Sequence, residues 1–192
     1  MVTDFDIHPD NPQARTIQQV VNLVRDGGLI AYPTDSSYAL GCQLGNAEGL
    51  ARMKGIRHLD DKHHFTLVCH DFAQMKGSTA GAYSFILPAT KGVPRRLMHP
   101  KKKTVGVRIP DNEVVQALVG ELGEPLISTT LLLPGDEQPL SSGWEVIERL
   151  GDQVDGVVDA GDCGTEPTTV IDLSGSSPVI LRRGSGETDR FE

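Results

Sequence analysis

Two arginines stand in apolar stretches of this sequence and are suited to hold an anion. Arg108 lies between Val107 and Ile109 in an alternating stretch, and Arg182 ends another apolar stretch two residues before a glycine. A guanidinium group in such surroundings is best explained by a carboxylate or phosphate partner in a cleft. We therefore expect each arginine to contact an anionic ligand.

Hydroxyl side chains cluster at the ends of three predicted strands. They are Thr34, Ser36 and Ser37 after the first strand, Ser128, Thr129 and Thr130 at the end of the second, and Thr168 and Thr169 at the start of the third. Such hydroxyls commonly cap turns. In open α/β sheets, however, ligands bind in the crevice at strand ends, where these groups and the arginines would form a polar pocket. The sequence leaves both interpretations open.

Basic residues are concentrated in one segment of an otherwise acidic chain. The formal net charge is −8, divided into −2 for residues 1–90, +7 for residues 91–108 and −13 for residues 109–192. The basic residues of that segment are Lys91, Arg95, Arg96, Lys101, Lys102, Lys103 and Arg108. The overall charge disfavours a uniform coat for nucleic acid or an anionic membrane. Locally, the three consecutive lysines predict either a solvated hairpin tip or a rim that gathers phosphates.

Strands and helices that position these residues alternate along most of the chain. Ile17, Val20, Val21 and Val24 repeat with helical spacing before the glycine pair at 27–28. Further helices are predicted over 47–57 with Asn46 as N-cap, after an Asp111 or Asn112 cap, and around Trp144, Ile147 and Leu150. Strands are predicted over 29–32, 65–69, 83–87, 104–109, 125–129, 154–158, 169–173 and 179–182. This order predicts an α/β fold with a mixed sheet, in one domain over 1–192 with a polar tail from about residue 184.

Several familiar motifs are missing from the sequence. There is no G-x-x-x-x-G-K-[ST] loop, no G-x-S-x-G and no H-E-x-x-H. His63 and His64 are adjacent, so on a strand their rings would point to opposite sides and would not share a metal ion. The three cysteines, Cys42, Cys69 and Cys163, form no CxxC pair, which favours a reducing compartment. Acidic residues near the N-terminus and the lack of a long apolar run predict a cytoplasmic protein without a membrane partner.

Taken together, these segments resemble the YrdC/YciO family over nearly the whole chain. The resemblance rests on residues 28–41 (GLIAYPTDSSYALG), 104–110 (TVGVRIP), 125–130 (PLISTT) and 168–173 (TTVIDL) followed by 181–184 (LRRG). The YciO branch is the most similar, because residues 7–12 (IHPDNP) and 91–97 (KGVPRRL) also match it. The resemblance implies a twisted mixed sheet with flanking helices around a large open cavity.

The resemblance also implies a chemistry. Catalytic members are L-threonylcarbamoyl-AMP synthases, which combine L-threonine, bicarbonate and ATP with Mg²⁺, release pyrophosphate and supply the intermediate for the t6A modification of tRNA. No permanently bound metal is expected. Family members are also associated with binding double-stranded RNA, which the Lys91, Arg95, Arg96, Lys101, Lys102 and Lys103 face would contact. The residues that match the family's substrate and nucleotide pocket are Thr34, Ser36, Tyr38, Arg57, Arg108, Ser128, Thr130, Thr168 and Arg182.

The sequence departs from the family pattern mainly at the nucleotide end of this site. The lysine of the family's lysine-x-arginine pair is one residue early, as Lys54, and Gly55 takes its place. Thr130 replaces the asparagine of the Ser-x-Asn motif, and Cys69 stands where catalytic members have a histidine. The segment 73–82 is shorter than expected, which suggests a missing helix or lid. Three functions therefore stay open: forming or processing L-threonylcarbamoyl-AMP, binding RNA, and regulation by a bound nucleotide without turnover.

Overall fold

The computed structural model describes residues 1–70 and 80–192 of the chain. In these two ranges ten strands form one sheet. The strands are β1 (Thr3–Asp6), β2 (Ile30–Pro33), β3 (Tyr38–Gln43), β4 (Thr66–Val68), β5 (Tyr83–Pro88), β6 (Thr104–Arg108), β7 (Leu126–Thr130), β8 (Gly156–Asp159), β9 (Thr169–Asp172) and β10 (Val179–Arg182). The α-helices are α1 (Ala14–Arg25), α2 (Ala47–Arg57), α3 (Glu113–Leu122) and α4 (Gly143–Leu150). Short 3₁₀ helices lie at Arg95–Leu97, Gly151–Gln153 and Asp189–Phe191.

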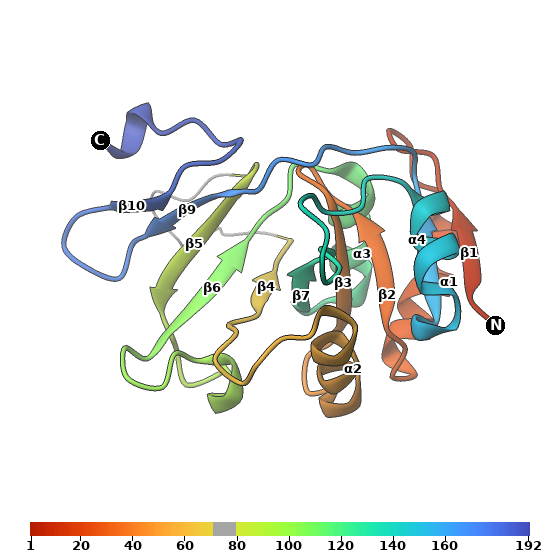
Figure 1. Cartoon of the computed structure of the whole chain (residues 1–192), viewed down its shortest axis with the longest axis horizontal. Coiled ribbons are helices and arrows are strands. Elements are labelled where there is room, and N and C mark those ends of the chain that lie inside the picture. Colours follow the sequence, from red (N-terminus) through yellow and green to blue (C-terminus); the bar gives the residue numbers. More distant parts are fainter. Residues whose placement is uncertain (71–79) are drawn as a thin grey trace.

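The sheet is mixed, as the alternating elements predict. Its strand order is β1-β8-β2-β3-β7-β4-β6-β5-β9-β10 (Figure 1). The pairs β1–β8, β2–β8, β4–β6 and β5–β9 are parallel, and the other neighbours are antiparallel. The two chain ends lie at opposite ends of the sheet (Figure 1). Each strand predicted from the sequence is present, with bounds that differ by no more than two residues. The predicted α/β class with a mixed sheet is therefore confirmed.

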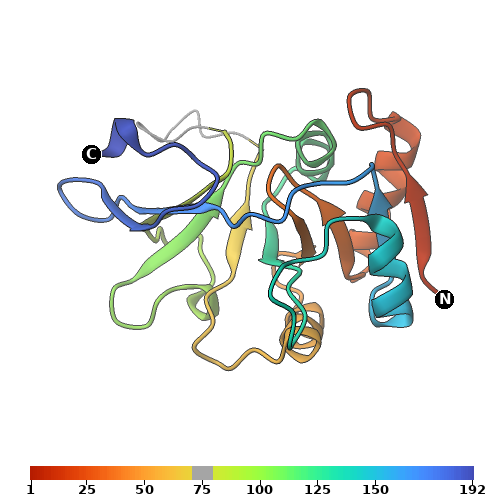
Figure 2. The same ribbon diagram turned by 45° about the horizontal axis from the view of Figure 1, so that its top comes forward.

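Helices cover the two faces of the sheet unequally. α1 and α3 pack on one face, and α2 and α4 lie on the other (Figures 1 and 2). The four apolar residues that predict α1 are all buried, so the helical repeat is confirmed. On the second face none of the four helices lies over β5, β6 and β9 (Figures 1 and 2). That half of the sheet is consequently left for loops and a cavity.

Two predicted caps fix where helices begin. The side chain of Asn46 accepts a hydrogen bond from the Gly49 amide at 2.8 Å, and that of Asn112 accepts one from the Val115 amide at 3.0 Å. Each satisfies an amide that the first helical turn leaves without a partner. Of the two candidate caps for α3, Asn112 is therefore the one used.

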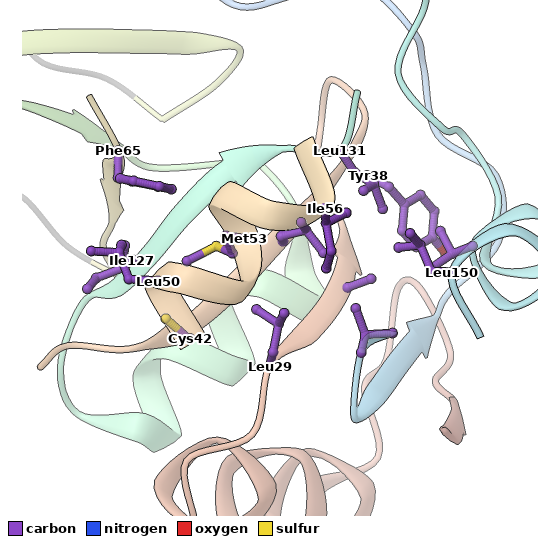
Figure 3. Close-up of a cluster of buried hydrophobic side chains, with 14 of the residues drawn as sticks. Leu29, Tyr38, Cys42, Leu50, Met53, Ile56, Phe65, Ile127, Leu131 and Leu150 are labelled. Atoms are coloured by element: carbon purple, nitrogen blue, oxygen red, sulfur yellow. The ribbon is translucent and has the colours of Figure 1, made fainter. Parts of the chain in front are cut away.

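Beneath α2 lies the larger of the two main apolar clusters. Leu50, Met53 and Ile56 of the helix belong to one buried cluster with Leu29 and Ile127, and Ile56 lies near Leu131 and Tyr38 (Figure 3). Full burial of each such side chain contributes about 1.5 to 3 kcal/mol to the stability of the folded chain. This packing holds the C-terminal end of α2, where Arg57 lies, against the sheet.

The sequence patterns missed two strands and misplaced one helix face. β3 is buried on both faces over most of its length, so it lacks the alternation that marks a half-exposed strand. β1 is a short edge strand with a single buried residue. In α4 the expected Trp144 is 67% exposed, and the buried positions are Gly143, Val146 and Leu150. The buried residues of α4 therefore follow helical spacing, but the buried face begins at Gly143 and not at Trp144.

Residues 184–192, predicted to be a polar tail, pack against β5 and β9. The Thr169 hydroxyl donates to the Gly186 carbonyl at 2.6 Å, and the Tyr83 hydroxyl donates to the Glu187 carbonyl at 3.0 Å. The Phe191 ring lies edge-on to Tyr83, with 5.8 Å between centroids. The polar composition of residues 184–192 therefore did not reveal that Phe191 and the carbonyls of Gly186 and Glu187 hold this segment against the sheet. In the described part of the chain no helix has the length and apolar character needed to cross a membrane.

Candidate functional site

A cavity of about 490 Å³ opens beside the strands that no helix covers on the second face. Thr66 of β4, Ser84 of β5, Thr104 of β6 and Val170 of β9 contribute to its wall. The segments 63–65, 129–139 and 165–168 supply further lining residues. This volume suits a small organic ligand such as an amino acid or a nucleotide. A large cavity beside a twisted sheet is what the sequence resemblance implies.

Four of the predicted site residues meet in this cavity. Arg57 comes from the end of α2, Thr130 from the end of β7, Thr168 from just before β9, and Arg182 from the end of β10. These positions are far apart in the sequence, so only the sheet order brings them together. Their convergence makes this cavity the candidate site.

Arg57 is held in a small cluster on the cavity wall. Its Nε donates to the Leu132 carbonyl at 3.1 Å, and its Nη1 donates to the Thr129 hydroxyl at 2.5 Å. Nε2 of His63 lies 3.2 Å from the same Thr129 oxygen. Burial, reinforced by Arg57 and His64, lowers the pKa of His63. A neutral imidazole therefore stands beside a fixed guanidinium at neutral pH.

Arg182 forms a second cluster with hydroxyl groups. Its Nε and Nη2 donate to the Thr168 carbonyl at 3.1 and 2.8 Å, and Nη2 also reaches the Thr168 hydroxyl at 3.2 Å. That hydroxyl lies 2.9 Å from Ser84 Oγ. Within residues 1–70 and 80–192 neither Arg57 nor Arg182 forms an ion pair. Both therefore contribute positive charge to the cavity wall, which favours an anionic ligand.

Three histidines in the cavity escaped the sequence analysis as site residues. They are His63, His64 and His99. His63 and His64 precede β4 in an irregular segment, so the strand geometry considered for them in the sequence does not apply. The rings of His64 and His99 stack with centroids 4.9 Å apart. Across the described ranges no three His, Cys, Asp or Glu side chains are arranged to hold a metal ion. No pattern around His99 marks it in the sequence.

Arg108 does not line the cavity, and its anionic partner is part of the protein. Its guanidinium forms an ion pair with Asp35, and its Nη2 donates to Thr34 Oγ1 at 3.2 Å and Ser36 Oγ at 3.0 Å. Arg108 is only 7% exposed. In the described structure its Nε has no hydrogen-bond partner. Thr34, Ser36 and Arg108 thus form one buried cluster outside the cavity lining.

Tyr38 and Ser128 also lie outside the lining, although the resemblance placed them in the pocket. The Tyr38 hydroxyl donates to the Val158 carbonyl at 3.2 Å. Ser128 Oγ lies 2.6 Å from the Tyr32 hydroxyl and donates to the Leu40 carbonyl at 3.0 Å. Burial raises the pKa of Tyr32 to about 12, so its hydroxyl stays protonated. These hydrogen bonds link β3 to β8, and β7 to β2 and β3.

The structure shows the surroundings of two residues, Lys54 and Cys69, at which the sequence departs from the family pattern. Lys54 pairs with Asp61 at 3.0 Å, and no lysine is among the described residues that line the cavity. Burial raises the pKa of Cys69 to about 11, so its side chain is an uncharged thiol. Residues 73–79 of the short 73–82 segment lie outside the described residues.

The predicted RNA-binding residues share one property. All six are exposed, and none has an ion-pair partner in the described structure: Lys91, Arg95, Arg96, Lys101, Lys102 and Lys103. Their charge is therefore available to an external anion.

Known proteins share this fold over its full length. The family model Sua5_yciO_yrdC, described as telomere recombination, matches residues 22–184. The uncharacterized protein YciO of Escherichia coli (strain K12) is 48% identical over 201 residues, covering 97% of this chain and 98% of its own length. The crystal structure of E. coli YciO matches with a TM-score of 0.93 at 47% identity, covering 100% of both chains. P. abyssi Sua5 complexed with L-threonine matches with a TM-score of 0.81 at 22% identity, over 96% of this chain and 57% of that one, which shows a shared fold.

Proposed function

The chain belongs to the Sua5, YciO and YrdC family, and on this basis we propose that its cavity binds L-threonine and an adenine nucleotide to form or process L-threonylcarbamoyl-AMP. The observation that carries the proposal is the pair of guanidinium groups, Arg57 and Arg182, that face one cavity without an acidic partner in the described structure. Both proposed ligands are anionic at a carboxylate or a phosphate. A relative of the same fold, P. abyssi Sua5, has been crystallised with L-threonine.

The proposed reaction requires charge stabilisation and a proton acceptor. The amino group of L-threonine and bicarbonate give a carbamate, with loss of a proton and of water. A carbamate oxygen then attacks the α-phosphorus of ATP, and the bond to the β-phosphate oxygen breaks to release pyrophosphate. Arg57 and Arg182 would stabilise the carboxylate and phosphate charges. The neutral imidazole of His63 would accept the ammonium proton.

Mg²⁺ would enter this site with the phosphates of ATP. Glu137 is the one carboxylate among the described residues that line the cavity. A single carboxylate together with substrate phosphates is a usual ligand set for Mg²⁺. Glu137 would therefore help to hold the ion, whose contribution when bound is to neutralise phosphate charge.

The proposal is tested by measuring pyrophosphate release from ATP with the full chain. Release that depends on both L-threonine and bicarbonate, and that falls in Arg57→Met and Arg182→Met, would support it. Arg25→Met is the matched control, because Arg25 ends α1 on the opposite face of the sheet, donates to the Glu121 and Leu122 carbonyls and is not among the lining residues. Release without dependence on L-threonine, or equal loss in all three variants, would contradict synthesis at this site.

The processing direction needs its own measurement. If the site hydrolyses this adenylate, L-threonylcarbamoyl-AMP and water should give AMP and the carbamate of L-threonine, and Arg182→Met should slow the reaction. Tight binding of ATP or AMP with turnover in neither direction would instead indicate a nucleotide-binding regulator.

A second candidate function, recognition of double-stranded RNA, is favoured by the six exposed basic residues without ion-pair partners in the described structure. Phosphate contacts predict an affinity for duplex RNA that falls steeply with salt. Unchanged RNA affinity after replacing all six residues with glutamate would exclude this face as the RNA site.

A further inference from the structure

The cavity contains less positive charge than a nucleotide polyphosphate carries negative charge. Arg57 and Arg182 are the only guanidinium groups among its described lining residues, and no lysine joins them. Each phosphate group of a nucleotide contributes one or more negative charges. Lys54, the nearest match to the family's lysine, is paired with Asp61. Besides Mg²⁺ entering with the nucleotide, cationic side chains close to the cavity would therefore favour binding of its phosphates.

Three lysines lie between two residues of the cavity wall. The chain leaves the wall at His99 and returns to it at Thr104, with Lys101, Lys102 and Lys103 in between. The His99 amide donates to the Thr104 carbonyl at 2.8 Å, and the Lys103 amide donates to the His99 carbonyl at 2.9 Å. These bonds close residues 99–104 into a compact loop, which we call the basic turn.

The imidazole of His99 belongs to the cavity wall and to the basic turn at once. Its Nδ1 accepts hydrogen bonds from the amides of Lys101 at 3.2 Å and Lys102 at 3.1 Å. An acceptor Nδ1 places the proton of the neutral ring on Nε2. The ring also stacks on His64, another residue of the wall. His99 thus fixes the basic turn at the edge of the cavity.

The basic turn is further restrained and its charges are available. The Ala89 amide, just after β5, donates to the Lys103 carbonyl at 2.8 Å. Lys103 itself has a φ of 54°, in the left-handed region that side chains rarely adopt. All three lysines are exposed and have no ion-pair partner in the described structure. A strained, anchored turn that presents three free ammonium groups is suited to bind phosphates.

We propose that the basic turn is the polyphosphate-binding rim of the cavity, with Lys101, Lys102 and Lys103 contacting the terminal phosphates of a nucleoside triphosphate whose remainder lies inside. This inference rests on the proposed function in that it takes a nucleotide to be the cavity's ligand. It assigns to residues 101–103 the charge that Lys54 does not supply. His99 acts as a positioning residue.

The charge of the turn is tested by calorimetric titration of the full chain with ATP, ADP and AMP. The variant Lys101→Glu, Lys102→Glu, Lys103→Glu should weaken ATP binding by at least about tenfold and AMP binding much less. Inorganic triphosphate should compete with ATP in the wild type. The comparison variant Lys91→Glu, Arg95→Glu, Arg96→Glu has the same charge change outside the turn. Equal loss in both variants, unchanged ATP affinity, or absence of ATP binding by the folded wild type would overturn the proposal.

The positioning role of His99 is tested by two substitutions that separate its two contacts. The side-chain oxygen of asparagine can accept the amides two and three residues ahead, so His99→Asn should keep the turn and the ATP affinity. His99→Phe keeps a ring on the wall but loses the acceptor, and it should weaken ATP binding. If His99→Asn binds ATP more weakly than His99→Phe, and circular dichroism shows that both variants are folded, His99 does not position the basic turn.

Two further measurements distinguish a polyphosphate rim from L-threonylcarbamoyl-AMP chemistry and from an RNA contact. If ATP affinity depends on the turn but no pyrophosphate is released and L-threonine does not bind, the proposed function fails while the polyphosphate rim is supported. If duplex RNA binds through Lys101–Lys103 and ATP neither binds there nor competes, the turn is an RNA contact and the polyphosphate rim is wrong.

Discussion

Arg108 and Asp35 form a largely buried ion pair that ties the loop after β2 to the end of β6. One carboxylate oxygen of Asp35 accepts from the Arg108 guanidinium, and the other accepts from the Asp111 amide at 2.9 Å. The side chains are 8% and 13% exposed. The arginine that the sequence marks as a ligand contact is therefore already neutralised by the fold.

Removing the carboxylate of this pair should destabilise the protein strongly. Asp35→Ala leaves a buried guanidinium without a counter-charge, and breaking such a pair costs about 3 to 5 kcal/mol. The double variant Asp35→Ala, Arg108→Met should lose less than the sum of the single changes. The free energy of unfolding in urea measures both effects. Asp136→Ala, which breaks the more exposed pair with Arg149, is the control and should change it much less. Equal losses in Asp35→Ala and Asp136→Ala would contradict this account.

Ser128 and Thr130 should behave oppositely although they are two residues apart on β7. Ser128→Ala removes the buried hydrogen bonds to Tyr32 and Leu40, which should cost about 1 to 3 kcal/mol of unfolding free energy. It should leave the affinities for L-threonine and ATP unchanged. Thr130→Val, at an exposed position on the cavity wall, should reduce ligand affinity with little effect on stability. Urea unfolding and calorimetric titration of both variants distinguish the two roles, and a binding loss confined to Ser128→Ala would reverse the assignment.

His63 should make stability depend on pH just below neutrality. Burial, then Arg57 and His64, lower its pKa in the folded state, whereas the unfolded chain has the ordinary value of about 6.5. Between these values the unfolded state binds more protons, so the free energy of unfolding rises with pH. The contribution is fully present above about pH 6.5 and is lost as pH falls toward the folded-state pKa. Unfolding of wild type and His63→Gln, compared from about pH 8 to about pH 5, should give curves that converge or cross as the wild type loses stability. Parallel curves would show that His63 titrates normally.

Gly184 should be essential for the geometry around Thr168. A Cβ at Gly184 would lie 2.2 Å from the Pro167 carbonyl oxygen and 2.6 Å from the Thr168 carbonyl carbon, both backbone atoms. Gly184→Ala must therefore shift the chain after β10, at a cost of about 1 to 3 kcal/mol. The same shift should weaken ligand binding, since Arg182 is anchored on the Thr168 carbonyl. Gly175→Ala, whose nearest neighbour would be 3.9 Å away, is the matched control for both urea unfolding and ligand titration. If the two alanine variants are equally stable, the close approach at Gly184 is unimportant.

Local patterns were sufficient for most of the fold. The buried stripe of α1 and the caps of α2 and α3 are set by residues a few positions apart, so spacing alone predicts them. β3 was missed because it is buried on both faces and shows no alternation. The packing of residues 184–192 was missed because it depends on contacts with β5 and β9, not on composition.

The site was only partly predictable for a related reason. The resemblance identified Arg57, Thr168 and Arg182, which the cavity brings together. It did not reveal that Arg108 is paired with Asp35, a residue 73 positions earlier in the sequence. It also missed His99, which lines the cavity and accepts hydrogen bonds from two backbone amides of the basic turn. Which polar groups already have protein partners is decided by tertiary contacts that a sequence motif does not encode.

The cavity also sets a constraint on how the protein is made. Its wall includes Arg57 and Arg182, which lie 125 residues apart in the sequence. The parallel pairing of β5 with β9 joins segments more than 80 residues apart, and such non-local pairing makes folding slow. The cavity wall therefore cannot form until the segments up to β10 have been synthesised and paired. A ligand can consequently stabilise the folded cavity, but it cannot guide folding intermediates in which β9 and Arg182 are not yet in place.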